Sequence, residues 1–120
     1  MAREFDPEKG RDFVGRAHGW IVTHPAAWRR LVRTCERCQK TYGRVSRDLV
    51  FALCEAEGER VSDDPAFMKA HDLWSALVRY VIRYSSDDIE YKAMASNIEA
   101  AYPDLRGMPE LPDWVLEGAA

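Results

Sequence analysis

Two cysteines in the second quarter of the chain have the spacing of a metal or redox site. Cys35 and Cys38 form a C-x-x-C sequence, the pattern that zinc sites and thiol–disulfide enzymes use. Both fall on the apolar side of a predicted helix, and there is no second C-x-x-C; Cys54 with His24 or His71 would complete four ligands only if the fold gathered them. We therefore expect the three cysteines to pack as small apolar side chains, and we predict neither a metal nor another cofactor.

A His-Asp dipeptide is the second candidate for chemistry. His71-Asp72 resembles the metal-binding dipeptide of the helical HD phosphohydrolases, a resemblance that covers two residues of the chain. It implies a metal-dependent hydrolase whose remaining ligands come from histidines upstream and aspartates downstream. The candidates for those ligands are His18, His24, Asp104 and Asp113. The helical pattern directs His71 and Asp72 to different faces, so we favour a histidine at the edge of the core and predict that the protein is not an enzyme.

The third feature is a concentration of positive charge in a chain whose formal net charge is −3. Residues 28–47 carry seven cationic side chains and one acidic one, whereas residues 86–120 carry two cationic and eight acidic side chains. On a helix six of these cations, those up to Arg44, fall on one face, provided that the periodicity continues through Arg44. The candidate binding residues are Arg29, Arg30, Arg33, Arg37, Lys40, Arg44 and Arg47.

Cations at this spacing suit a ligand that carries successive phosphates. Six of the seven are arginine, whose planar guanidinium binds phosphate and carboxylate groups through two parallel hydrogen bonds. We therefore predict a non-enzymatic binding module that contacts the backbone of DNA or RNA, alone or as a small subunit of a nucleoprotein assembly. In its short length, capped helices and segregated charge, the chain resembles small phage and defence-system proteins that bind nucleic acid or block a partner.

The same cations allow two alternatives. They can meet an acidic protein surface, including residues 86–120 of a second copy, which would make the chain a protein-interaction or self-associating module. Residues 86–120 can equally fold back and cover the cations within one molecule. A helix-turn-helix is disfavoured, because the third predicted helix becomes apolar after Arg47 and Asp48, whereas a recognition helix presents polar side chains in its first turns.

Caps and periodicity predict an all-α fold, a compact single-domain bundle of about five helices. The expected helices span residues 7–22, 25–42, 47–57, 65–84 and 87–102, and an irregular Pro-containing tail follows over 103–120. Asp6 with Pro7 begins the first helix, Gly43 ends the second, and Ser46 caps the third. The minority interpretation makes strands of the apolar runs 49–54 and 77–84. We divide the chain into a helical domain over 1–102 and a C-terminal tail.

The fourth helix is expected at the centre of the bundle because apolar side chains occupy a broad face of it. Arg79 and Arg83 fall on its charged face. We expect Trp114 in the tail either to dock on the bundle or to bind a partner. The predicted core comprises Trp28, Leu31, Phe51, Leu53, Phe67, Trp74, Leu77, Val78, Val81 and Ile82.

Composition is that of an ordinary globular protein, with 47% hydrophobic and 31% charged residues. No apolar run approaches the roughly 18 residues that cross a bilayer, and the first residues mix charges without an apolar signal core. An odd number of cysteines fits reduced thiols. We therefore expect a cytoplasmic protein with no membrane partner.

Overall fold

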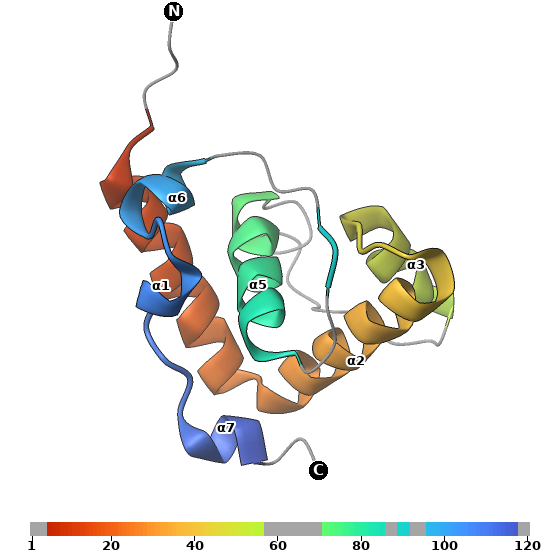
Figure 1. Ribbon diagram of the computed structural model, residues 1–120. Helices are drawn as coiled ribbons and strands as arrows, with labels where there is room; N and C mark the ends of the chain where they lie inside the picture. Colours follow the sequence, from red (N-terminus) through yellow and green to blue (C-terminus); the bar gives the residue numbers. More distant parts are fainter. Residues whose placement is uncertain (1–4, 57–70, 86–88, 92–95, 118–120) are drawn as a thin grey trace, which may run out of the picture.

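Figure 1 shows the computed structural model, which describes residues 5–56, 71–85, 89–91 and 96–117. All the regular elements in these residues are helical. The longer helices are α1 (Pro7–Thr23), α2 (Pro25–Tyr42), α3 (Arg47–Ala56) and α5 (His71–Tyr84). The shorter ones are α6 (Asn97–Ala101), the 3₁₀ helix η1 (Leu105–Gly107) and α7 (Asp113–Glu117). The predicted all-α fold is confirmed, and the strand interpretation of 49–54 and 77–84 is wrong.

Local signals fix the ends of α1 and α2 where the sequence predicts them. The Asp6 carboxylate accepts a hydrogen bond from the Glu8 N–H at 2.9 Å, immediately before Pro7 begins α1. α2 begins at Pro25, and Gly43 ends it with a φ of 74°. The Gly43 N–H donates to the Gln39 carbonyl at 2.8 Å. A left-handed residue at this position ends a helix and turns the chain away from its axis.

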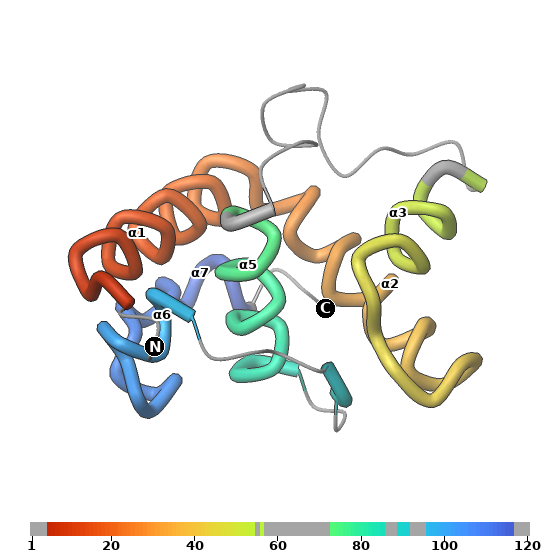
Figure 2. Tube along the Cα trace, turned by 90° about the horizontal axis from the view of Figure 1, so that it is seen from above, coloured from red at the N-terminus to blue at the C-terminus, as the bar shows by residue number. Residues whose placement is uncertain are grey.

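α5 is the central helix, as predicted. Figures 1 and 2 show it between α1 on one side and the α2–α3 pair on the other. Every side chain from Ala76 to Val81 is buried, at 2% exposure or less, so α5 is enclosed on all faces rather than on one stripe. The expected charged face is therefore wrong for Arg79, which lies inside the core.

The predicted core is largely confirmed. The buried members are Trp28, Leu31, Trp74, Leu77, Val78 and Val81. Phe51, Leu53 and Ile82 are only partly buried, because they lie at the edge of the packed region. Phe67 lies outside the described residues, as do the predicted end of the third helix at residue 57 and the predicted start of the fourth at residue 65.

The predicted helix over 87–102 is wrong at residues 89–91, which are not helical. Their backbone bonds to distant residues instead: the Val45 N–H donates to the Glu90 carbonyl at 2.8 Å, and the Glu90 N–H donates to Gln39 Oε1 at 2.7 Å. Trp74 Nε1 also donates to the Tyr91 hydroxyl at 3.3 Å. The next described helix is α6, which Ser96 caps.

The segment after residue 102 carries η1 and α7, so the expectation of a wholly irregular tail needs correction. Met108, Leu111 and Val115 are buried, at 2%, 4% and 0% exposure, and belong to the same core as α1 and α5. α7 docks through Val115, which leaves Trp114 52% exposed. Apolar residues interrupted by prolines thus bury their side chains without forming a long helix.

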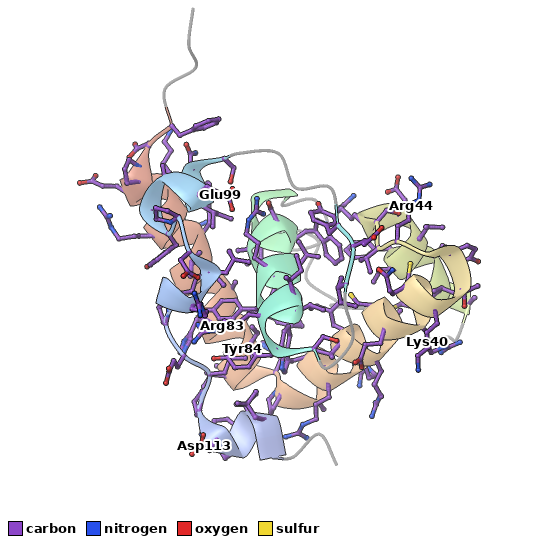
Figure 3. All side chains as sticks on the ribbon, in the orientation of Figure 1. Lys40, Arg44, Arg83, Tyr84, Glu99 and Asp113 are labelled. Atoms are coloured by element: carbon purple, nitrogen blue, oxygen red, sulfur yellow. The ribbon has the colours of Figure 1, made fainter. Side chains whose placement is uncertain are left out.

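Side chains of α5 bind the main chain of this segment. The Tyr80 hydroxyl donates to the Pro109 carbonyl at 2.8 Å, and Arg83 Nη1 donates to the Met108 carbonyl at 2.7 Å. The Tyr84 hydroxyl accepts from the Leu111 N–H at 3.0 Å. Figure 3 labels Arg83 and Tyr84 on the part of α5 beside this segment. These bonds satisfy backbone groups that have no helical partners.

An ion pair joins α5 to α6, with Arg79 buried and the Glu99 side chain 33% exposed. Arg79 is 2% exposed, and its Nε and Nη2 donate to the Glu99 carboxylate at 2.6 and 2.9 Å. Arg79 Nη1 also donates to the Ser75 carbonyl at 2.8 Å, and the same carboxylate accepts from the Ser96 N–H at 3.1 Å. Burial alone would raise the pKa of Glu99, but the hydrogen bonds from Arg79 and Ser96 and the charge of Arg79 outweigh it and lower that pKa.

We predict that Glu99→Gln lowers the free energy of unfolding by about 3 kcal/mol at neutral pH, because it removes the charged acceptor of two hydrogen bonds from the buried Arg79 guanidinium. The pKa of Glu99 is lower in the folded state, so its stabilising effect is present above the ordinary value of 4.5 and is lost as the pH falls through the folded value. Urea unfolding of both proteins from pH 7 to pH 3 should show the difference shrinking below about pH 4. A difference that stays constant over this range would contradict the assigned role of the carboxylate.

α1 and α6 approach most closely at Gly10. A Cβ atom there would lie 2.0 Å from the Asn97 carbonyl oxygen and 2.6 Å from its carbon. The Asp6 N–H also donates to the side-chain Oδ1 of Asn97 at 2.8 Å, which holds the start of α1 against α6. Only glycine fits between the two helices without moving them.

We predict that Gly10→Ala destabilises the protein by about 3 kcal/mol, the upper end of the cost of overpacking, because a backbone carbonyl cannot yield as a side chain can. Gly15→Ala is the matched control, since it lies on the same helix with nothing within 4 Å of the added atom. That variant should be more stable by up to about 1 kcal/mol, since alanine favours helix. Equal thermal unfolding midpoints for the two variants would show that the α1–α6 approach is not close.

Candidate nucleic-acid interface

α2 positions its cations by burying its opposite side. Leu31, Cys35 and Cys38 are at most 1% exposed and attach the helix to the core. Arg33 and Lys40 are exposed on the other side, and seven residues of α-helix separate them by about 10 Å along the axis. Because the helix is anchored along its length, these charges are held at fixed spacing.

The predicted basic face continues only to the end of α2. The left-handed Gly43 breaks the periodicity that would have brought Arg44 onto the face, and Figure 3 shows Lys40 and Arg44 on different sides of the α2–α3 corner. Arg47 begins α3, where its guanidinium carbon lies 4.8 Å from the centroid of the Phe51 ring. The face therefore consists of Arg29, Arg30, Arg33, Arg37 and Lys40, called the α2 cation face below.

The members of this face differ in their availability. Arg33 and Lys40 are exposed, and no ion pair within the described residues involves either of them or Arg29. Arg37 is also exposed, while Arg29 and Arg30 are partly buried; Arg30 and Arg37 have interactions within the chain. Arg33 and Lys40 are thus the cations most accessible to a ligand.

Three carboxylates of the acidic segment contact cations outside the α2 cation face. Glu99 binds Arg79, Asp104 lies 2.9 Å from Arg106, and Glu110 lies 3.7 Å from Arg83. Hydrogen bonds from the Arg106 side chain and backbone lower the pKa of Asp104. α7 reaches α2 through the apolar side chains of Val115 and Leu116, which line a groove with Arg29. Beside Arg29, the segment therefore presents apolar side chains rather than a carboxylate.

The three cysteines pack in the core, as predicted. All are buried; Cys38 Sγ donates to the Arg44 carbonyl at 3.2 Å, and Cys54 Sγ donates to Thr34 Oγ1 at 3.8 Å. Burial raises the pKa of the Cys35 thiol, and the neighbouring cysteines raise it further. Within residues 5–56, 71–85, 89–91 and 96–117, no three His, Cys, Asp or Glu side chains are grouped so that they can hold a metal ion.

The other candidate ligands of the hydrolase hypothesis have separate contacts. His18 Nε2 is hydrogen-bonded to the Glu110 carbonyl at 2.9 Å, and His24 stacks on Trp20 with ring centroids 5.3 Å apart. Asp104 pairs with Arg106. The side chains of His71 and Asp72 lie outside the described part of the structure. The described residues therefore give the hydrolase hypothesis no assembled site.

Sequence reasoning missed the groove between α2 and α7, where Tyr84 and Leu116 meet Arg29. These residues come from three elements far apart in the chain. The only local signal was the apolar Val115-Leu116 pair after the three prolines, which indicated docking without showing where.

Comparison of the chain with protein-family models, curated proteins and solved structures gives no match. None of the described helices has both the length and the apolar character needed to cross a bilayer.

We predict that the thiols of the folded protein react slowly with maleimide at pH 8, because burial removes access and keeps the Cys35 thiol protonated. Mass spectrometry of the labelled protein should show no modification after a time in which the urea-unfolded chain is modified at all three cysteines. Rapid labelling of the folded protein at Cys35 or Cys38 would contradict their packing in the core.

Proposed function

We propose that this protein is a non-enzymatic module whose α2 cation face binds the phosphate backbone of nucleic acid. The observation that carries the proposal is the exposure of Arg33 and Lys40 on an anchored helix, without an ion pair in the described part of the chain. Such cations release condensed counterions when they meet a polyanion, and this release drives sequence-independent binding. The module would act alone or as a small subunit of a nucleoprotein assembly.

We favour phosphate over the acidic segment of a second copy as the ligand, because carboxylates of that segment are already bound within their own chain. Glu99 and Asp104 already accept hydrogen bonds from arginines of their own chain, which makes them poorer partners for another molecule. Arg33 and its neighbours on α2 are mostly guanidinium groups, which suit phosphate oxygens through paired hydrogen bonds. Self-association through residues 86–120 is the outcome that would replace this proposal.

Backbone contact, rather than base reading, is favoured by the side chains around the cations. Adenine is read mainly by Asn or Gln, and Gln39 is the amide side chain on α2, where its Oε1 accepts from the Glu90 N–H. α3 makes a poor recognition helix, because Val50 and Cys54 are buried and Arg47 lies over Phe51. The proposal therefore expects affinity that depends on salt and hardly on base sequence.

The test compares Arg33→Glu/Lys40→Glu with Lys9→Glu/Arg11→Glu, a charge-matched control with exposed cations on α1. Fluorescence anisotropy with labelled single-stranded and double-stranded oligonucleotides, repeated over a range of salt, measures the affinity. If about four phosphates are contacted, the wild type should show a slope of log K against log salt near −3 on single strands. The α2 variant should lose about half of that slope, whereas the control should keep most of it.

Equal losses in the two variants would show that net charge, and not the α2 cation face, determines binding. No binding by the wild type at low salt would refute the proposal. In that case sedimentation equilibrium over a range of protein concentrations would test the self-associating alternative.

A further inference from the structure

A groove of about 280 Å³ lies between α2 and α7. Figure 1 shows α7 beside the corner where α1 leads into α2. Its walls are mainly apolar, contributed by Trp28 and Val32 of α2 and by Val115 and Leu116 of α7. Trp28 is 3% exposed and Val115 is fully buried, so the inner wall is part of the core.

Two guanidinium groups line the same groove. Arg29 Nε is shielded from solvent and has no hydrogen-bond partner among the described residues, and Arg33 follows one helical turn later with its side chain exposed. A buried donor without an acceptor is unfavourable, and two like charges four residues apart repel each other. Glu36 also lines the groove, but its carboxylate accepts from the Ser85 hydroxyl and pairs with neither arginine in the described residues. The groove thus combines apolar walls with two guanidinium groups against one carboxylate, a net positive charge that an anion would satisfy.

We propose that this groove binds a small amphipathic carboxylate. The apolar chain of the ligand packs between Val32 and Leu116, and its carboxylate accepts hydrogen bonds from Arg29 and Arg33. The volume is near the lower limit of small-molecule sites, which suits a medium-chain carboxylate. This inference does not rest on the proposed function, because it requires no nucleic acid.

The larger hollow at the α2–α3 corner is a weaker candidate. It measures about 590 Å³ and is lined by residues 43–46 and 89–91. Arg44 and Glu90 contribute opposite charges to it, so it has no net charge to select an anion or a cation. The α2–α7 groove differs by presenting two cations and a buried donor beside apolar walls.

The test is calorimetric titration of the full chain with octanoate, kept below the concentration at which it forms micelles. Octanol supplies the same chain without the charge, and inorganic phosphate supplies an anion without the chain. Octanoate should bind at least about tenfold more tightly than either, because a charge-assisted hydrogen bond typically increases affinity by about a factor of ten or more. Equal affinity for octanol would overturn the role of the arginines, and equal affinity for phosphate would overturn the role of the apolar walls.

Variants locate the site. Arg29→Gln should weaken octanoate binding about tenfold, and Val32→Phe should abolish it by filling the groove, whereas Lys9→Gln, remote on α1, should leave it unchanged. Circular dichroism confirms that each variant is folded, and the octanoate-to-octanol comparison on the wild type stands even if a variant unfolds. Unchanged octanoate binding in folded Arg29→Gln and Val32→Phe would overturn the proposal.

Two variants separate octanoate binding in the groove from nucleic-acid binding on the α2 cation face. Val32→Phe should lose octanoate and keep nucleic acid, since it removes no charge. Lys40→Glu should keep octanoate binding and weaken nucleic-acid binding, since Lys40 does not line the groove.

Discussion

The arrangement of the helices depends on the buried charge of Arg79. This guanidinium lies in the central helix with 2% exposure, so it requires a counter-charge inside the fold. Glu99 supplies it, and the same carboxylate completes the capping box of α6 with Ser96. α6 then packs on α1 at Gly10, and α1 leads directly into α2. The exposed pair Arg16–Asp12, with side chains 70% and 55% exposed, contributes far less, since exposed pairs are worth about 0–1 kcal/mol. The ion pair of the buried Arg79 with Glu99 therefore connects the core, through α6 and α1, to the helix that carries the exposed cations.

Local chemistry determined what could be predicted from the sequence. The start of α1 at Asp6-Pro7 and the end of α2 at Gly43 depend on neighbouring residues, and both were predicted correctly. Residues 89–91 were expected to be helical and are not, because their hydrogen-bond partners, Val45 and Gln39, lie more than forty residues earlier in the chain. Arg79 was placed on a charged face for a similar reason: a helical projection cannot show that Glu99 will meet it. Failures thus occur where a distant partner overrides a local preference.

In the candidate site, too, features set by neighbouring residues could be predicted and features set by distant residues could not. The sequence located the cations of α2, because three- and four-residue spacing is a property of the helix itself. It could not show that Gly43 turns Arg44 away, that Arg47 lies over Phe51, or that α7 forms a groove against Arg29. In the structure the arginines fall into two kinds. Arg79 and Arg106 are paired with carboxylates, whereas Arg33 is exposed on α2 without an ion pair in the described residues.

This difference is the central claim, and the guanidinium NMR signals of individual arginines test it most directly. Nitrogen-15 spectra of the side-chain Nε–Hε groups would be recorded while a short oligonucleotide is added at low salt. The account predicts that the Arg33 signal, followed by that of Arg29, shifts or broadens with added oligonucleotide, while the signals of Arg79 and Arg106 stay in place. A titration in which the α2 signals are unmoved, or in which Arg106 shifts as much as Arg33, would contradict it.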